Sequence, residues 1–98
     1  MTRISILISE WISLLKTNFI LNRKIKLIWD FRGPEALEIA KHHVIHLEEF
    51  AVKEELYFFE TSVDAVNDLY CMAYITVKEE DMITYRDALV PHRGEVAQ

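Results

Sequence analysis

Residues that interrupt or cross-link a chain are scarce in this sequence: it has two glycines, two prolines and one cysteine, Cys71, among 98 residues. Few glycines and prolines predict few tight turns, and therefore long elements joined by short connections. One cysteine excludes an intramolecular disulfide framework and a cysteine-rich zinc site. It also suits a reducing compartment, so we expect a cytoplasmic location.

Basic residues are outnumbered. Eleven Lys+Arg stand against sixteen Asp+Glu, which leaves a net charge of −5 with histidine neutral. Because nucleic acids are bound by basic surfaces, this balance argues against a nucleic-acid partner. The charge is also divided unevenly, with six basic and two acidic residues in 1–32 and five basic and fourteen acidic residues in 33–98.

The sequence also has no apolar run that suits a membrane span. The most apolar stretch, Ile4–Leu21, contains Glu10 and Lys16, and a charge at the centre of a span costs about 2.5–3.5 kcal/mol. No small-residue cleavage site follows it, which argues against a secretory signal. Its apolar residues fall on one helical side, so we interpret residues 1–22 as carrying an amphipathic helix from Ile4 to about Asn18. A strand is the competing interpretation, because β-branched residues alternate at Ile4, Ile6 and Ile8.

A large apolar fraction is what the sequence does contain. Hydrophobic residues make up 51%, which is enough to bury a core, and the length suits one domain over 1–98. Alternating residues predict a strand from Lys24 to Arg32, which Gly33-Pro34 ends. Proline at a first helical position favours a helix from there to about Lys53. The buried stripe of this helix is expected at Leu37, Ala40, Val44, Leu47 and Ala51.

Two more strands and a second helix are predicted in the remainder. The strands span Leu56–Val63 and Leu69–Lys78, and the turn formers at 64–68 connect them as a hairpin. The acidic residues at 79–81 favour the start of a helix through Leu89. Pro91 ends that helix, and residues 92–98 form either a short edge strand or an irregular arm.

The predicted fold class is α+β: an N-terminal helix followed by β-α-β-β-α(-β), with the helices on one face of an antiparallel sheet. In this order of elements, residues 24–98 resemble a ferredoxin-like split β-α-β module. Modules of this shape are similar to the dimeric α+β barrels, in which two sheets pack face to face. That superfamily includes cofactor-independent monooxygenases, ligand-sensing regulators and proteins of no known activity.

The strands offer large apolar groups on both faces of the sheet, whereas the helices can cover only one. We expect the second face to carry Ile28, Phe58, Tyr70, Met72 and Tyr74. Because a monomer seldom exposes so large an apolar patch, a second subunit or the N-terminal segment should cover it. The sequence therefore predicts a homodimer.

One run of the first helix is rich in metal-ligand types. Five residues share the side away from the apolar stripe: Glu35, Glu38, His42, His46 and Glu49. The last four are the candidate metal ligands. Histidines at i and i+4 can bind one cation, so zinc or another divalent metal is one hypothesis. Two donors do not close a tetrahedral site, and a solvated face is the alternative. His43 lies nearer the apolar stripe and is expected to be half-buried.

A second candidate site is the turn from the first strand into this helix. A helix N-terminus beside an arginine can bind an anion or a carboxylate. The candidate residues are Arg32 and Gly33, with Arg93 leaning onto the same end. Pro34 removes one of the amides that such a site would use, and structural punctuation also explains Gly33-Pro34.

No nucleophile motif is present, and Cys71 lies mid-strand, where a thiol is normally inert. We therefore expect a small homodimeric binding or assembly protein with no cofactor, and a small molecule as a further partner. An oxygenase or isomerase that needs no cofactor is the alternative. Its residues, in a cavity between helix and sheet, would be Trp29, His43, Tyr70, Tyr74 and His92. A third hypothesis is metal binding through His42 and His46.

Overall fold

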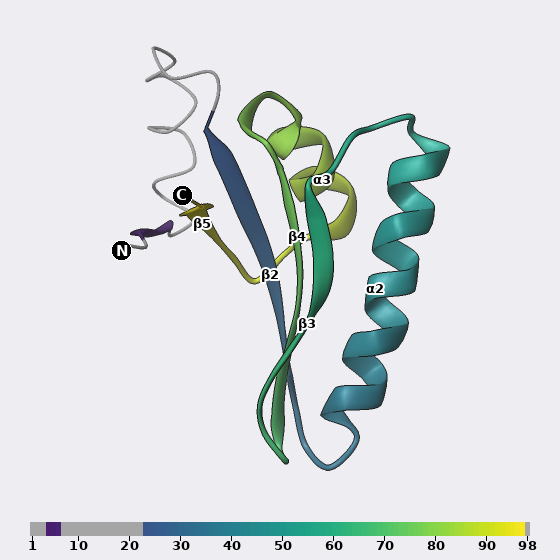
Figure 1. Cartoon of the computed structure of the whole chain (residues 1–98), viewed down its shortest axis with the longest axis vertical. Coiled ribbons are helices and arrows are strands. Elements are labelled where there is room, and N and C mark those ends of the chain that lie inside the picture. Colours follow the sequence, from purple (N-terminus) through teal and green to yellow (C-terminus); the bar gives the residue numbers. More distant parts are fainter. Residues whose placement is uncertain (1–3, 7–22, 98) are drawn as a thin grey trace.

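The computed structural model of the chain describes residues 4–6 and 23–97. Their elements are β1 (Ile4–Ile6), β2 (Lys24–Arg32), α2 (Ala36–Lys53), β3 (Glu60–Asn67), β4 (Tyr70–Lys78), the 3-10 turn η1 (Glu79–Asp81), α3 (Met82–Leu89) and β5 (Arg93–Ala97). The strands form one antiparallel sheet, and α2 and α3 lie on the same face of it (Figure 1). The predicted α+β class with helices on one face is confirmed for these residues.

The order of strands in the sheet is β1-β5-β2-β4-β3. Because neighbours are antiparallel, β2 and β3 are parallel and lie on either side of β4, with α2 joining them. In the same way α3 joins β4 to β5 across β2. These two split β-α-β connections are compatible with a ferredoxin-like module. The strand β1, which lies beyond β5, makes the order of the whole sheet differ from that module.

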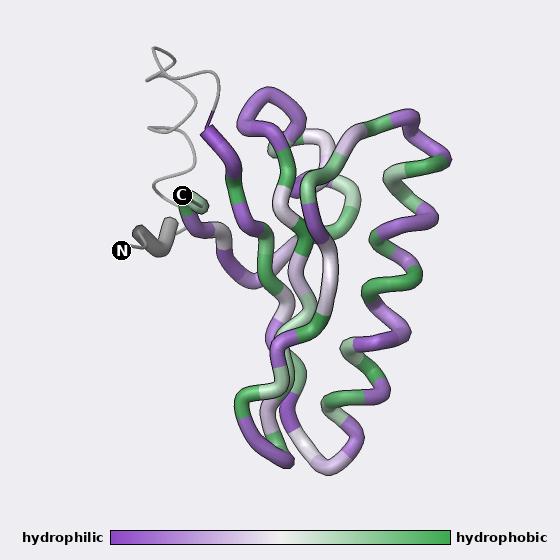
Figure 2. The backbone as a smooth tube through the Cα atoms, viewed as in Figure 1, coloured by the Kyte–Doolittle hydropathy of each residue, from purple (hydrophilic) through white to green (hydrophobic). Residues whose placement is uncertain are grey.

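The core lies between the helices and the face of the sheet that alternate strand residues share. Leu27 of β2 stands level with Ile75 of β4, and neither side chain is exposed to solvent. Leu47 of α2 and Met82 of α3 pack onto this pair in one cluster. Along β2 and α2, green and purple stretches alternate in Figure 2, as expected when apolar residues recur at strand and helix periods.

Tyr85 anchors the shorter helix α3 in this core. Its side chain is fully buried and its ring packs against Phe50, with centroids 5.5 Å apart. Its hydroxyl donates a hydrogen bond of 3.2 Å to the backbone carbonyl of Tyr57. Burial, followed by the charge of Asp81, raises the pKa of Tyr85 to about 12, so the phenol stays neutral in the core.

The predicted strand Lys24–Arg32 and the helix that follows it are confirmed. The buried stripe of α2 is confirmed at Ala40, Leu47 and Ala51 but was wrong at Leu37. Leu37 is 39% exposed, and Ala36, only 1% exposed, takes its place in the core. Gly33 has φ 111°, a left-handed conformation that favours glycine, so the chain can reverse there between β2 and α2. The Ala36 amide donates a hydrogen bond of 3.1 Å to the Gly33 carbonyl, which closes a tight turn. Because of this turn, Ala36 faces the sheet.

The second predicted strand is displaced along the sequence. Residues 56–59 precede β3, which begins at Glu60, and residues 64–67 belong to β3 although we expected them in the hairpin connection. The turn occupies only residues 68–69, because the Asn67 side chain accepts a hydrogen bond of 2.8 Å from the Leu69 amide. Because of this hydrogen bond, the hairpin turn lies later in the sequence than the turn-forming residues at 64–68 predicted.

The two ends of the chain also differ from the expectation. Residues 4–6 form β1, so the competing strand interpretation is confirmed there and the helix was wrong for these residues. The rest of the predicted N-terminal helix lies outside the described residues. The tail forms β5, but it is not at the edge of the sheet, because it pairs with both β1 and β2. None of the helices in the described part of the chain is long and apolar enough to cross a membrane.

Candidate functional site

The face of the sheet opposite the helices is polar and aromatic. Tyr70, Met72 and Tyr74 are half-buried on it, and Ile28 is only 1% exposed. Cations cover the two rings: the guanidinium carbon of Arg32 lies 4.0 Å from the Tyr70 centroid, and Nζ of Lys26 lies 4.1 Å from the Tyr74 centroid.

Phe58 is not part of the face opposite the helices, which we call the open face because neither α2 nor α3 covers it. It packs against the core cluster on the helix side of the sheet. The prediction for Phe58 was wrong because residues 56–59 precede β3 and do not follow its alternation. The described residues therefore form no bare apolar patch of the kind expected on this face.

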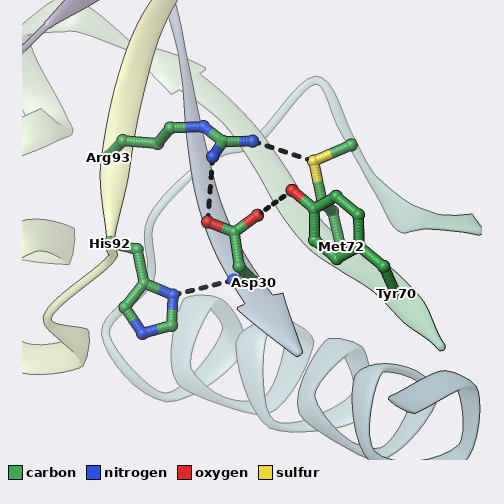
Figure 3. Close-up of polar contacts among 5 residues, drawn as sticks. All are labelled: Asp30, Tyr70, Met72, His92 and Arg93. Atoms are coloured by element: carbon green, nitrogen blue, oxygen red, sulfur yellow. Dashed lines mark hydrogen bonds and ion pairs between the residues drawn. The ribbon is translucent and has the colours of Figure 1, made fainter. Parts of the chain in front are cut away.

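Asp30 is the centre of a polar cluster on the open face (Figure 3). The Tyr70 hydroxyl donates to Oδ1 of Asp30 at 2.5 Å, and Nη1 of Arg93 donates to Oδ2 at 2.9 Å. The other terminal nitrogen of Arg93 lies 2.9 Å from the sulfur of Met72. Three strands, β2, β4 and β5, thus contribute to one cluster.

Within this cluster the positive charge of Arg93 is balanced by the negative charge of Asp30. Burial acts to lower the pKa of Arg93, but the hydrogen bond with Tyr70 and the negative charge of Asp30 outweigh burial and raise that pKa. Both carboxylate oxygens of Asp30 accept hydrogen bonds from cluster members. The cluster therefore joins three strands.

His92 completes the edge of β2. The register of β5 along β2 ends at Ile28 and Arg93, so the Asp30 amide lies beyond the last strand pair on that side. That amide donates a hydrogen bond of 2.7 Å to Nδ1 of His92 (Figure 3). The ring supplies the acceptor that a neighbouring strand would have given, and its proton is accordingly on Nε2.

The three residues proposed for an anion do not meet at one point. The Gly33 amide donates to the Leu69 carbonyl at 2.9 Å. Arg93 is engaged by Asp30 and Met72 as described above, and Arg32 lies over the ring of Tyr70. Each of these groups thus has a contact within the described residues, and anion binding at this turn stays a prediction.

The candidates for an enzyme are divided between the two faces of the sheet. The ring of Trp29 lies on the helix side, 4.8 Å from that of His43, and its Nε1 donates to the Leu89 carbonyl at 2.9 Å. Tyr70 and Tyr74 lie on the open face, where the Tyr74 hydroxyl bonds to Glu60 at 3.0 Å. These side chains therefore do not surround a common cavity.

His43 is half-buried, as expected, against Trp29 and Phe31. Its Nε2 atom is buried and has no hydrogen-bond partner within the part of the chain that the structure describes. Burial lowers the pKa of His43 most, and the positive charges that His46, His92 and His42 can carry lower it further. The imidazole is accordingly neutral near pH 7.

The helical histidine run partly assembles. Nε2 of His42 and Nε2 of His46 are 2.9 Å apart, and Nδ1 of His46 lies 3.2 Å from a carboxylate oxygen of Glu49. Glu38 instead pairs with Lys41 at 3.8 Å. Among residues 4–6 and 23–97, no group of three or more His, Cys, Asp or Glu side chains could hold a metal ion. The structure thus places two nitrogen donors together without a third protein ligand.

The outer face of α2 is a feature that the sequence reasoning missed. Ile45 is 50% and Val52 is 77% exposed, and both line a shallow hollow of about 360 Å³. The other residues of this hollow are Glu48, Glu49 and Lys53. The sequence contains a signal for this face, because Ile45 and Val52 are seven residues apart and lie on the helix side opposite the buried stripe.

A second hollow, of about 190 Å³, lies between α2 and β3. Its lining residues are Lys41, Val44, Thr61, Ser62 and Val63. Neither hollow is lined by any of the enzyme candidates. No family model matches the chain, and neither the curated proteins nor the solved structures contain a match. The geometry of the described residues is thus the basis for a functional argument.

Proposed function

We propose that the protein is a small binding or assembly protein that forms a homodimer through the outer face of α2. We define this face by Glu38, Lys41, Ile45, Glu48, Val52 and Lys53. The observation that carries the proposal is the exposed apolar pair Ile45 and Val52, flanked by charges of both signs.

The apolar pair supplies a driving force for association. Ile45 and Val52 lie two helical turns apart on one side of α2, half and three-quarters exposed. Taking a large aliphatic side chain fully out of water is worth about 1.5–3 kcal/mol. A dimer with a two-fold axis buries this pair twice.

The flanking charges favour one orientation of the two helices. In an antiparallel pair whose two-fold axis passes between Val44 and Ile45, Lys41 comes level with the partner's Glu48, because both residues are equally far from the axis. By the two-fold symmetry this opposite-charge pair occurs twice. A parallel pair would place Lys41 against the partner's Lys41, so the charges specify the antiparallel arrangement.

Sedimentation equilibrium of the full chain tests the proposal. We expect a species of twice 11.6 kDa at micromolar concentration, and monomers for Ile45→Asp and for Val52→Asp, because each buries an unpaired charge. Ile39→Asp is the matched control: Ile39 is on the same helix and is 46% exposed, close to the value for Ile45, but it faces another side. Circular dichroism verifies that each variant is folded.

A charge exchange tests the orientation. Lys41→Glu and Glu48→Lys should each weaken the dimer by about tenfold, and the double variant should restore it because the pair is re-formed with its signs reversed. A native chain that stays at 11.6 kDa over the whole concentration range would contradict the homodimer. A dimer that the double variant weakens further would contradict the antiparallel α2 pairing.

A further inference from the structure

We propose that His42 and His46 form a two-nitrogen site for a divalent transition-metal ion that prefers right-angled coordination, Cu²⁺ or Ni²⁺. The two imidazoles are one helical turn apart on the solvent side of α2, and both are exposed. Their rings are nearly perpendicular, at 85°, with centroids 4.5 Å apart. Their Nε2 atoms are the closest approach between them, at 2.9 Å.

The separation of two nitrogens bound to one ion depends on the coordination geometry of the ion. With metal–nitrogen bonds of about 2.0–2.1 Å, two nitrogens at a right angle are about 2.9 Å apart, whereas two at a tetrahedral angle are about 3.3–3.4 Å apart. The observed 2.9 Å is the hydrogen-bonded separation of the two rings in the metal-free chain, and the right-angled geometry would need the smaller displacement of the nitrogens. Square-planar and octahedral ions with nitrogen ligands are typically Cu²⁺ and Ni²⁺, whereas Zn²⁺ prefers a tetrahedron.

Glu49 orients one of the two donors. Its carboxylate lies 3.2 Å from Nδ1 of His46 and favours the tautomer in which Nδ1 carries the proton. Nε2 of His46 then offers its lone pair, and in the metal-free chain the Nε2 proton of His42 points to it. When the ion binds, the proton of His42 moves to its own Nδ1, and both Nε2 lone pairs face the metal.

The site is a chelate with two protein ligands. No third His, Cys, Asp or Glu joins the pair within the described ranges, so water fills the other positions of the ion. Imidazole nitrogens do not suit Ca²⁺ or Mg²⁺, which prefer oxygen ligands. The exposure of both rings leaves the ion open to solvent and to exchange.

Isothermal titration of the full chain with nickel(II) chloride is the first test. We expect one ion per chain, and binding weaker by about tenfold or more in His42→Gln and in His46→Gln, since either change removes the chelate. Glu49→Gln should weaken binding less than either histidine change. His92→Gln is the matched control, because its Nδ1 already accepts the Asp30 amide proton, and it should bind as the native chain does.

Electron paramagnetic resonance with Cu²⁺ supplies a second measurement. The native chain should show hyperfine splitting from two imidazole nitrogens, and each single variant should show one. Equal nickel affinity in the native chain and the two histidine variants, or tighter binding of Zn²⁺ than of Ni²⁺ at one pH, would overturn the proposal. The titration is repeated on Ile45→Asp, where unchanged nickel binding separates this site from the proposed dimer.

Discussion

The two faces of the sheet remove large side chains from water in different ways. On the helix side of β4, Cys71, Ala73, Ile75 and Val77 are at most 1% exposed under α2 and α3. On the open side of the same strand, neighbouring residues are half-buried beneath cations and hydrogen-bonded to carboxylates. Among the described residues, charged neighbours thus cover part of the aromatic surface of this strand.

The largest expected effect comes from the helix-covered face. Ile75→Ala should lower the free energy of unfolding by about 2–5 kcal/mol, because Ile75 is fully buried and its loss leaves a cavity. Met72→Ala, on the half-buried open face of the same strand, should cost less. Urea unfolding followed by circular dichroism measures both. Equal losses would show that the open face is packed as a second core.

The polar cluster of the open face should respond to a change of charge. Asp30→Asn keeps the side-chain shape but leaves Arg93 without its ion-pair partner, and should cost about 1–2 kcal/mol, since both partners are partly exposed. The control is Glu60→Gln, which alters only the exposed contact with Tyr74 and should cost under about 0.5 kcal/mol. Equal stability of the two variants, again by urea unfolding, would mean that the three-strand cluster contributes nothing.

The smallest effect concerns His43, a polar group on the apolar face. Because burial lowers its pKa from the ordinary 6.5, the unfolded chain takes up a proton at this position before the folded chain does. The stability contributed by neutral His43 is therefore present above about pH 6.5 and is lost as the pH falls below it.

His43→Phe keeps the ring contacts with Trp29 and Phe31 and should remove this part of the pH dependence. Thermal unfolding at about pH 7.5 and about pH 5.5 measures this pH dependence. The melting temperature should change less between the two pH values in the variant than in the native chain. His46→Gln removes one of the charges that lower the pKa of His43 but leaves its burial, so it should reduce the pH dependence less than His43→Phe does. A variant and a native chain with the same pH profile would contradict the assignment to His43.

Most of the fold followed from residue periodicity. The alternation in β2 and β4 and the three-four spacing in α2 and α3 are dictated by which side of each element meets the core. Two of the errors fall where a local hydrogen bond decides the geometry. The Asn67 side chain sets the hairpin turn, and the Gly33 carbonyl sets the first residue of α2.

The candidate sites were less predictable because they depend on distant pairings. Spacing on one helix was enough to place His42 beside His46. It could not show that Asp30 joins Tyr70 and Arg93, which are 40 and 63 residues away along the chain. Nor could composition show that cations lie over the tyrosines. The spacing of Ile45 and Val52 was sufficient to predict a second apolar stripe on the outer face of α2.

The place of β5 has a consequence for how the sheet comes apart. In the described sheet β1 has no neighbour except β5, and the register joins Ile4 to Val96, nearly the whole chain apart. Any fluctuation that detaches β5 from β2 therefore releases β1 with it, so the two strands open as one cooperative unit. During folding β1 must wait for β5, because its docking site is created only when β5 joins β2. The last strand of the chain, β5, thus controls when the first strand, β1, joins this edge of the sheet.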